Sequence, residues 1–190
     1  MDHNKKEQTM QEKVAGIESL DLKIAIAIGI CCFTSVLLRR SGIIFAYHGM
    51  NLEIIQLMTA SISCLLCCQE DSKFSLKAGS NRLIITAIGG AVGIAVILLD
   101  TISGNEWIKI ILIVIGILLT LWLCKIAKVP YINARIGGVT FILVTYTLSG
   151  NVRIWYALFR FVSTFYGVLI VMIVTWIFQY LAATKKKRKA

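Results

Sequence analysis

Two arginines introduce apolar stretches of the chain in the same way. The same residue types recur at one spacing, 78 positions apart, as Arg82, Thr86 and Gly89 and then as Arg160, Thr164 and Gly167. A guanidinium is a planar fork that can hold a carboxylate through two parallel hydrogen bonds. Each threonine lies one helical turn further on, where its hydroxyl can donate to a ligand. The doubled pattern therefore predicts two places that could hold an anion.

Each of these side chains also has a purely structural interpretation. Arginine near the end of a membrane helix commonly extends to the lipid headgroups and pairs with phosphate. Threonine inside a helix commonly donates to a carbonyl of its own preceding turn. The residue types leave both interpretations open. The deciding observation is whether Arg82 and Arg160 face a cavity, as ligand binding requires, or the lipid.

Other kinds of chemistry lack the side chains that they need. Cys64, Cys67 and Cys68 include a Cys-x-x-Cys spacing, and His3 and His48 are the two imidazoles of the chain. These groups do not form a converging set of four ligands, and cysteine often serves as a small apolar residue. No nucleophile with a base, no paired acids and no phosphate loop appear. The sequence therefore predicts neither a metal, a cofactor nor an enzyme.

The composition is that of an integral membrane protein. Hydrophobic residues make up 57% of the chain and charged residues 16%, and the mean hydropathy is +0.79. The net charge of +10 could indicate nucleic acid in a soluble protein. Here, however, the basic residues flank apolar runs and are not interleaved with aromatic residues on one face. We therefore expect a lipid bilayer as the partner and no nucleic acid.

Six apolar runs are long enough to be candidate membrane helices, and they predict an all-α bundle of six transmembrane helices. The runs are Leu22–Leu38, Leu52–Cys68, Leu83–Leu99, Trp107–Cys124, Val129–Leu148 and Trp155–Ala182. They divide the chain into a polar, partly amphipathic N-terminus (1–21), a transmembrane domain (22–182) and a basic tail (183–190).

The distribution of basic residues predicts the orientation of the bundle. Six crossings place both termini on one side, and 15 of the 20 Lys and Arg residues fall on that side. Positively charged segments are retained in the cytoplasm. We therefore predict a multi-pass protein of the cell membrane with both termini cytoplasmic.

The two arginine patterns approach the membrane from opposite sides. Three crossings separate Arg82 from Arg160, so the two halves are expected to be inverted three-helix repeats. Inverted repeats are a recurring construction of transporters, in which the substrate path follows the seam between the halves.

Small residues are expected to hold the bundle together. Lipid is as apolar as leucine, so membrane helices associate where small residues let their backbones approach. Ala25 with Gly29, Gly89 with Gly93, and Gly167 supply such positions. We predict that these residues lie at contacts between helices.

Two motifs resemble one known family of transporters. The run LKAGSNRLIITAIGGAVG, around Asn81 and Arg82, is similar to the start of the third span in the aromatic acid exporter family, also called the fusaric acid resistance family. The run ALFRFVSTFYGVLI, around Arg160, Ser163 and Gly167, is similar to the sixth span of that family. The resemblance covers about residues 21–180.

The resemblance implies a function and a set of site residues. It implies efflux of small hydrophobic or aromatic carboxylic acids, a small organic anion as the substrate, and the substrate-site residues Asn81, Arg82, Thr86, Arg160, Ser163 and Thr164. Family members commonly carry a large cytosolic domain after the sixth span, whereas this sequence ends at Ala190. A homo-oligomer or a partner chain is therefore also expected. The alternative is a non-transporting membrane subunit, or an interaction partner of a larger transporter.

Overall fold

A computed structural model of the chain describes residues 19–42, 44–47, 50–147 and 152–187. Nearly all of the predicted polar N-terminus, both histidines and the end of the basic tail lie outside these residues. The described elements are α2 (Ser19–Arg40), β1 (Ile44–Tyr47), β2 (Met50–Glu53), α3 (Leu57–Cys67), α4 (Ser72–Ser103), α5 (Glu106–Ile126), α6 (Tyr131–Tyr146) and α7 (Val152–Lys187). Each predicted apolar run overlaps one helix, so the prediction of an all-α membrane bundle is confirmed. The antiparallel hairpin of β1 and β2 is a small addition to it.

Four of these helices are long and apolar enough to cross a bilayer. They are α2, α4, α5 and α7, with spans at Leu20–Arg40, Ser72–Ser103, Glu106–Ile126 and Val152–Leu181. The spans of α4 and α7 are 44% buried inside the protein, whereas those of α2 and α5 are 17% buried. The first pair therefore forms the centre of the bundle, and the second pair lies at its periphery.

The helices α3 and α6 are shorter than the sequence predicts. The helix α3 has 11 residues and α6 has 16, which at 1.5 Å per residue corresponds to about 16 Å and about 24 Å. A bilayer core is about 30 Å thick. The predicted run Leu52–Cys68 is longer than α3 because its first residues belong to strand β2 and to a non-helical segment that reaches Gln56. Hydropathy does not separate such a segment from a helix.

Local signals in the sequence determine where some helices end. Gly104 adopts a left-handed conformation (φ 60°) after α4, where its backbone N–H bonds to the carbonyl of Asp100. The side chain of Asn105 then accepts a hydrogen bond from the N–H of Trp107 at 3.1 Å and caps the start of α5. Pro130 immediately precedes α6, and proline is favoured near the start of a helix.

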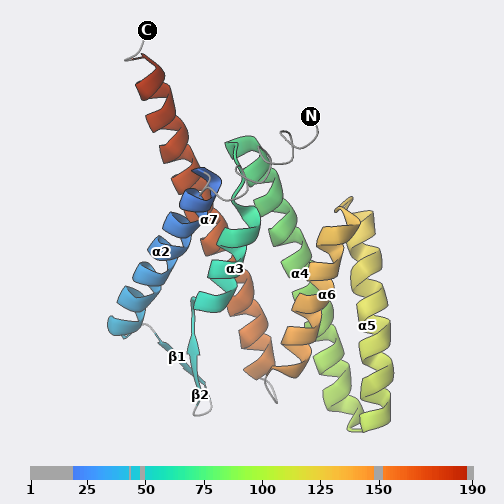
Figure 1. The fold of residues 1–190 in the computed structure, drawn as a ribbon. Helices are drawn as coiled ribbons and strands as arrows, with labels where there is room; N and C mark the ends of the chain where they lie inside the picture. Colours follow the sequence, from blue (N-terminus) through green and yellow to red (C-terminus); the bar gives the residue numbers. More distant parts are fainter. Residues whose placement is uncertain (1–18, 43, 48–49, 148–151, 188–190) are drawn as a thin grey trace, which may run out of the picture.

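The bundle consists of two inverted halves (Figure 1). Successive helices run in alternating directions, so α4 and α7 are antiparallel and pack against each other at the centre. The helix α3 packs against α7, just as α6 packs against α4. The helix α2 lies beside α3 and α7, just as α5 lies beside α6 and α4. The prediction of two inverted three-helix repeats is confirmed, and α2 begins at the end of the bundle where α7 finishes.

Two glycines bring helices of equivalent position into close contact. A Cβ atom placed on Gly89 of α4 would lie 2.5 Å from the carbonyl oxygen of Gly137 in α6. A Cβ atom on Gly167 of α7 would lie 2.5 Å from the carbonyl oxygen of Ala60 in α3. Only a residue without a side chain fits at either contact.

The same contacts set the register between the two halves. The second contact of Gly89 is the Cβ atom of Thr140, and the second contact of Gly167 is the Cβ atom of Ser63. Gly137 therefore corresponds to Ala60 and Thr140 to Ser63, each pair 77 positions apart. Residues of α3 and α6 thus correspond at an offset of 77, and residues of α4 and α7 at the offset of 78 seen in the sequence.

The other small residues differ in their surroundings. A Cβ atom on Gly93 would lie 2.9 Å from a side-chain carbon of Val144 in α6. Ala25 and Gly29, in contrast, lie on an exposed face of α2. No heavy atom of another helix lies within 4 Å of the Cβ position of Gly29. The predicted contact through Ala25 and Gly29 is therefore not made within the described part of the chain.

Candidate anion site at the seam between the halves

Both arginines of the repeated pattern lie inside the bundle. Arg82 is 5% exposed and Arg160 is 6% exposed. Neither guanidinium extends over the lipid-facing surface, so the headgroup interpretation does not describe this structure. They lie on α4 and α7, the two central helices, which pack against each other. Buried cations in an apolar bundle need groups that bond to them.

Arg160 has protein partners. Its Nη1 donates to the hydroxyl of Thr59 at 3.2 Å and to the phenol oxygen of Tyr156 at 3.3 Å. Thr59 in turn donates to the side-chain oxygen of Gln56 at 3.1 Å, and the amide of Gln56 donates to the carbonyl of Tyr156 at 3.3 Å. This network joins α7 to the start of α3. It leaves only the Nε of Arg160 buried without a partner.

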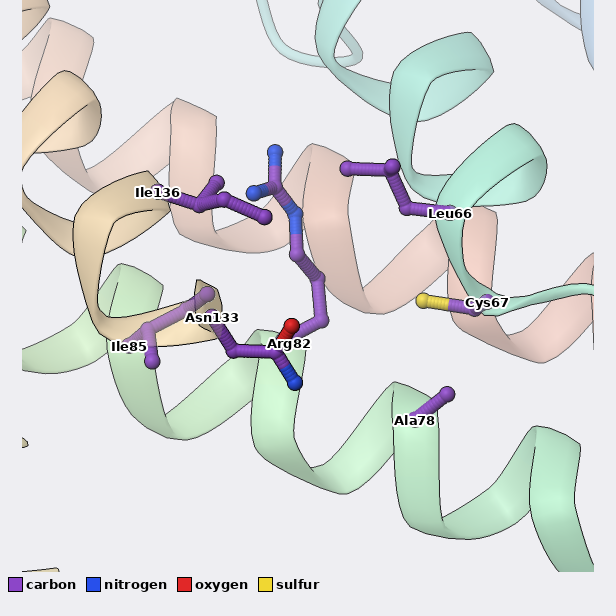
Figure 2. A pocket seen from close by; sticks show the side chains of 7 residues that line it. All are labelled: Leu66, Cys67, Ala78, Arg82, Ile85, Asn133 and Ile136. Atoms are coloured by element: carbon purple, nitrogen blue, oxygen red, sulfur yellow. The ribbon is translucent and has the colours of Figure 1, made fainter. Parts of the chain in front are cut away.

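Arg82 has no such partners. Among the described residues, its side chain makes no hydrogen bond or ion pair, and its Nε and Nη1 are both buried and unbonded. Each buried donor that lacks a partner costs about 1–3 kcal/mol. Figure 2 shows the guanidinium extending from α4 into the space between Leu66 of α3 and Ile136 of α6.

A cavity of about 60 Å³ surrounds this group. It is lined by Leu66, Cys67, Ala78, Arg82, Ile85, Asn133 and Ile136. The walls are apolar apart from the guanidinium, the thiol of Cys67 and the amide of Asn133. The sequence did not single out Asn133 or Ile136, because both lie 51 or more positions from Arg82. The correspondence with Gln56 and Thr59 is the signal that could have identified them.

The predicted threonines are bonded to their own helices. The hydroxyl of Thr86 donates to the carbonyl of Arg82 at 2.8 Å, and that of Thr164 donates to the carbonyl of Arg160 at 2.9 Å. Ser163 donates to the carbonyl of Phe159 at 2.6 Å and accepts from the N–H of Gln56 at 2.7 Å. In this structure each of these hydroxyl groups donates to a carbonyl four residues earlier in its own helix.

Asn81 lies beside Arg82 in the sequence but not in the cavity. It is half-buried, and it is not among the residues that line the space around the guanidinium. Successive residues of a helix point about 100° apart, so a neighbour in sequence faces another direction. Of the predicted site residues, Arg82 alone lines this cavity.

An apolar groove of about 220 Å³ follows the seam between α4 and α7. Its lining consists of Thr86, Ala87, Gly90, Ala91, Ile94, Ala157, Leu158 and Phe161. The small side chains on α4 create the space, and Phe161 supplies an aromatic wall. The groove begins one helical turn from Arg82.

A third buried arginine lies where α4 ends and α7 begins. Arg153 contacts Asp100 with 3.4 Å between Nη1 and Oδ2, and the same nitrogen donates to the carbonyl of Thr145 at 3.3 Å. Both charged side chains are largely buried. This pair joins the two central helices and neutralises its own charge, in contrast to Arg82.

The cysteines are all free, and five of the six are buried. Within the described ranges, no group of three or more His, Cys, Asp or Glu side chains could hold a metal ion. Cys31 and Cys64 are fully buried among apolar residues where α2, α3 and α7 meet. Their thiols act there as small packing groups.

Comparison with known proteins identifies one family. A family model described as fusaric acid resistance protein-like matches residues 30–174. The match includes both arginine patterns and extends from α2 into α7. No curated protein and no solved structure matches the chain.

Proposed function

The chain belongs to the fusaric acid resistance protein-like family, and from that premise we propose that it exports small hydrophobic or aromatic carboxylic acids across the cell membrane. The family indicates a role in membrane transport or resistance, carried out by a multi-pass membrane protein. The substrate class rests on the chemistry of the seam between the two halves.

Arg82 is the observation that carries the proposal. A buried guanidinium with two unbonded N–H groups next to a cavity is suited to an oxyanion, and a carboxylate matches the guanidinium fork. The neighbouring groove is apolar and has an aromatic wall, which suits the body of a hydrophobic acid. A charged head and an apolar body are the two parts of the proposed substrate.

The inverted arrangement supports movement of such a substrate. The halves contact each other through α4 and α7, and the short helices α3 and α6 occupy equivalent positions on either side. Short helices at corresponding positions of inverted repeats mark the binding site in several transporters. We propose that the halves rock about this seam and open the site alternately to the cytoplasm and to the outside.

The proposed direction is outward, with both termini in the cytoplasm. The excess of Lys and Arg on the side of the termini supports this orientation. The acid is an anion at neutral pH and does not cross the lipid readily, so a path lined by a cation would release it from the cell.

A transport assay in cells tests the proposal. Cells that express the wild-type protein should retain less labelled benzoate than cells without it, and Arg82→Ala should retain as much as cells without it. Arg39→Ala is the matched control, because Arg39 is 62% exposed and pairs with Glu53 far from the seam. Equal retention in all four strains, at equal protein levels in the membrane, would contradict export.

One observation favours a second candidate function. The small residues Ala25 and Gly29 lie on an exposed face of α2 that the described part of the chain leaves uncovered. Such a face suits contact with another membrane helix. The alternative is therefore a non-transporting subunit that binds a larger transporter. Purification in mild detergent separates the two, because a stoichiometric second chain supports the subunit and a homo-oligomer supports the exporter.

A further inference from the structure

We propose that the two equivalent arginines have different roles: Arg82 binds the carboxylate, whereas Arg160 is a structural tie between α7 and α3. The assignment of carboxylate as the ligand rests on the proposed function. The division of roles rests on the contacts of the two arginines.

The correspondence between the halves shows why the two arginines differ. Arg160 is bonded to Thr59 and Tyr156. The register of the helices places Ile136 at the position equivalent to Thr59, and Ala78 at the position equivalent to Tyr156. Both of these residues line the cavity around Arg82. The half that contains Arg82 has therefore lost the two hydroxyl groups that satisfy its counterpart.

The third member of each set remains polar. Gln56, which supports Thr59 beside Arg160, corresponds to Asn133, which lines the Arg82 cavity. Figure 2 shows the amide of Asn133 beside the base of the Arg82 side chain, while the guanidinium extends away from it. Asn133 adds a neutral polar group to the cavity wall, as the thiol of Cys67 does, and neither bonds to the guanidinium.

The position of α3 does not remove the need for a ligand. Leu66 and Cys67 belong to the last turn of α3, and the negative end of a helix dipole favours a nearby cation. This field lowers the cost of the charge. It leaves the Nε and Nη1 donors of Arg82 without an acceptor.

The size of the cavity limits what can enter. A volume of about 60 Å³ is much smaller than the roughly 300–1,000 Å³ of pockets that enclose a whole small-molecule ligand. It accommodates one carboxylate group, and the rest of the ligand must lie outside it. The ligand class is therefore a monocarboxylate with a separate apolar body.

Titration of the purified protein tests this division. Wild-type protein in phosphatidylcholine nanodiscs is titrated with sodium benzoate and with benzamide, which is uncharged, by isothermal calorimetry. We expect benzoate to bind at least about tenfold more tightly than benzamide. Arg82→Gln should abolish this preference without lowering the melting temperature, since it removes an unpaired buried charge.

The most informative variants place a residue from one half at the equivalent position of the other half. Ile136→Thr gives Arg82 the acceptor that Arg160 has, so benzoate affinity should fall about tenfold. Thr59→Ile, the matched change in the other half, should lower the melting temperature and leave affinity within about threefold. Arg160→Gln should behave like Thr59→Ile, and Tyr156→Phe is the milder substitute if Arg160→Gln does not fold.

Four results would overturn the proposal. The first two are equal binding of benzoate and benzamide, and benzoate affinity that is unchanged by Arg82→Gln. The third is loss of benzoate affinity in both Thr59→Ile and Tyr156→Phe. The fourth is displacement of benzoate by phosphatidic acid in the nanodisc, which would identify lipid phosphate as the occupant. Arg82-dependent benzoate binding in a protein that fails the cell assay would refute export and leave the binding site intact.

Discussion

Buried arginines in this bundle differ in how their charge is neutralised. Arg153 faces the carboxylate of Asp100, Arg160 donates to two hydroxyl groups, and Arg82 faces a cavity. The cost of a buried charge depends on the partners that bond to it, since removing water removes its solvation. The three side chains therefore contribute differently to stability although their burial is similar.

Asp100→Asn should destabilise the protein strongly. It leaves the buried charge of Arg153 without its carboxylate, and breaking one side of a buried ion pair costs about 3–5 kcal/mol. Thermal unfolding in detergent measures the effect as a lower melting temperature. A melting temperature equal to that of the wild type would show that the pair does not stabilise the fold.

Arg39→Gln is the matched control for that prediction. Arg39 pairs with Glu53, but the two side chains are 62% and 40% exposed. Exposed ion pairs contribute about 0–1 kcal/mol. The melting temperature should change little, and a loss as large as that of Asp100→Asn would mean that burial does not determine the contribution of the pair.

At the scale of the helices, two glycine contacts determine how closely the central helices approach the short helices. Gly89 and Gly167 allow the backbones of α4 and α7 to touch those of α6 and α3. The residue at each contact faces a carbonyl oxygen, which cannot move as a flexible side chain can. The distance between the central helices and the short helices is therefore fixed at both equivalent places.

Gly89→Ala should lower stability by about 1–3 kcal/mol, because its Cβ atom would lie 2.5 Å from a backbone oxygen and force the helices apart. Gly90→Ala is the control at the next position, where no heavy atom of another helix lies within 4 Å of the added Cβ atom. Alanine is favoured over glycine inside a helix, so this variant should be neutral or slightly more stable. Equal melting temperatures for the two variants would argue against the close contact.

At the scale of the whole molecule, alternation of the six helices determines which segments share a side. Lys73 at the start of α4 and Thr184 near the end of α7 lie at one end of the bundle, and Glu106 at the start of α5 lies at the other (Figure 1). All three side chains are exposed. Whether a reagent outside the cell reaches each residue therefore shows on which side of the membrane that end of the bundle lies.

Labelling with a membrane-impermeant thiol reagent tests this arrangement in intact cells. Single cysteines are introduced as Lys73→Cys, Thr184→Cys and Glu106→Cys, with Cys32 replaced by serine because the other native cysteines are buried. Only Glu106→Cys should react from outside, and the other two should react after the cells are permeabilised. Reaction of Thr184→Cys and Glu106→Cys from the same side would refute the proposed topology.

The sequence by itself determined the class of the protein. Long apolar runs have no stable place outside lipid, so the helical membrane bundle followed from hydropathy. The spacing of 78 residues between the arginine patterns, with three crossings between them, was enough to predict inverted halves. These features follow from the composition and the order of the apolar runs along the chain, and they do not require knowing how the helices pack.

Only the tertiary structure decided what the arginines contact. The bond from Arg160 to Thr59 and the cavity that Asn133 shares with Arg82 each join segments about 50 to 100 positions apart. Such contacts depend on how helices rotate and cross when they pack, because a turn of about 100° per residue decides which side chain faces inward. Two identical sequence patterns thus acquired different surroundings, and the difference lies in the helices that pack against them.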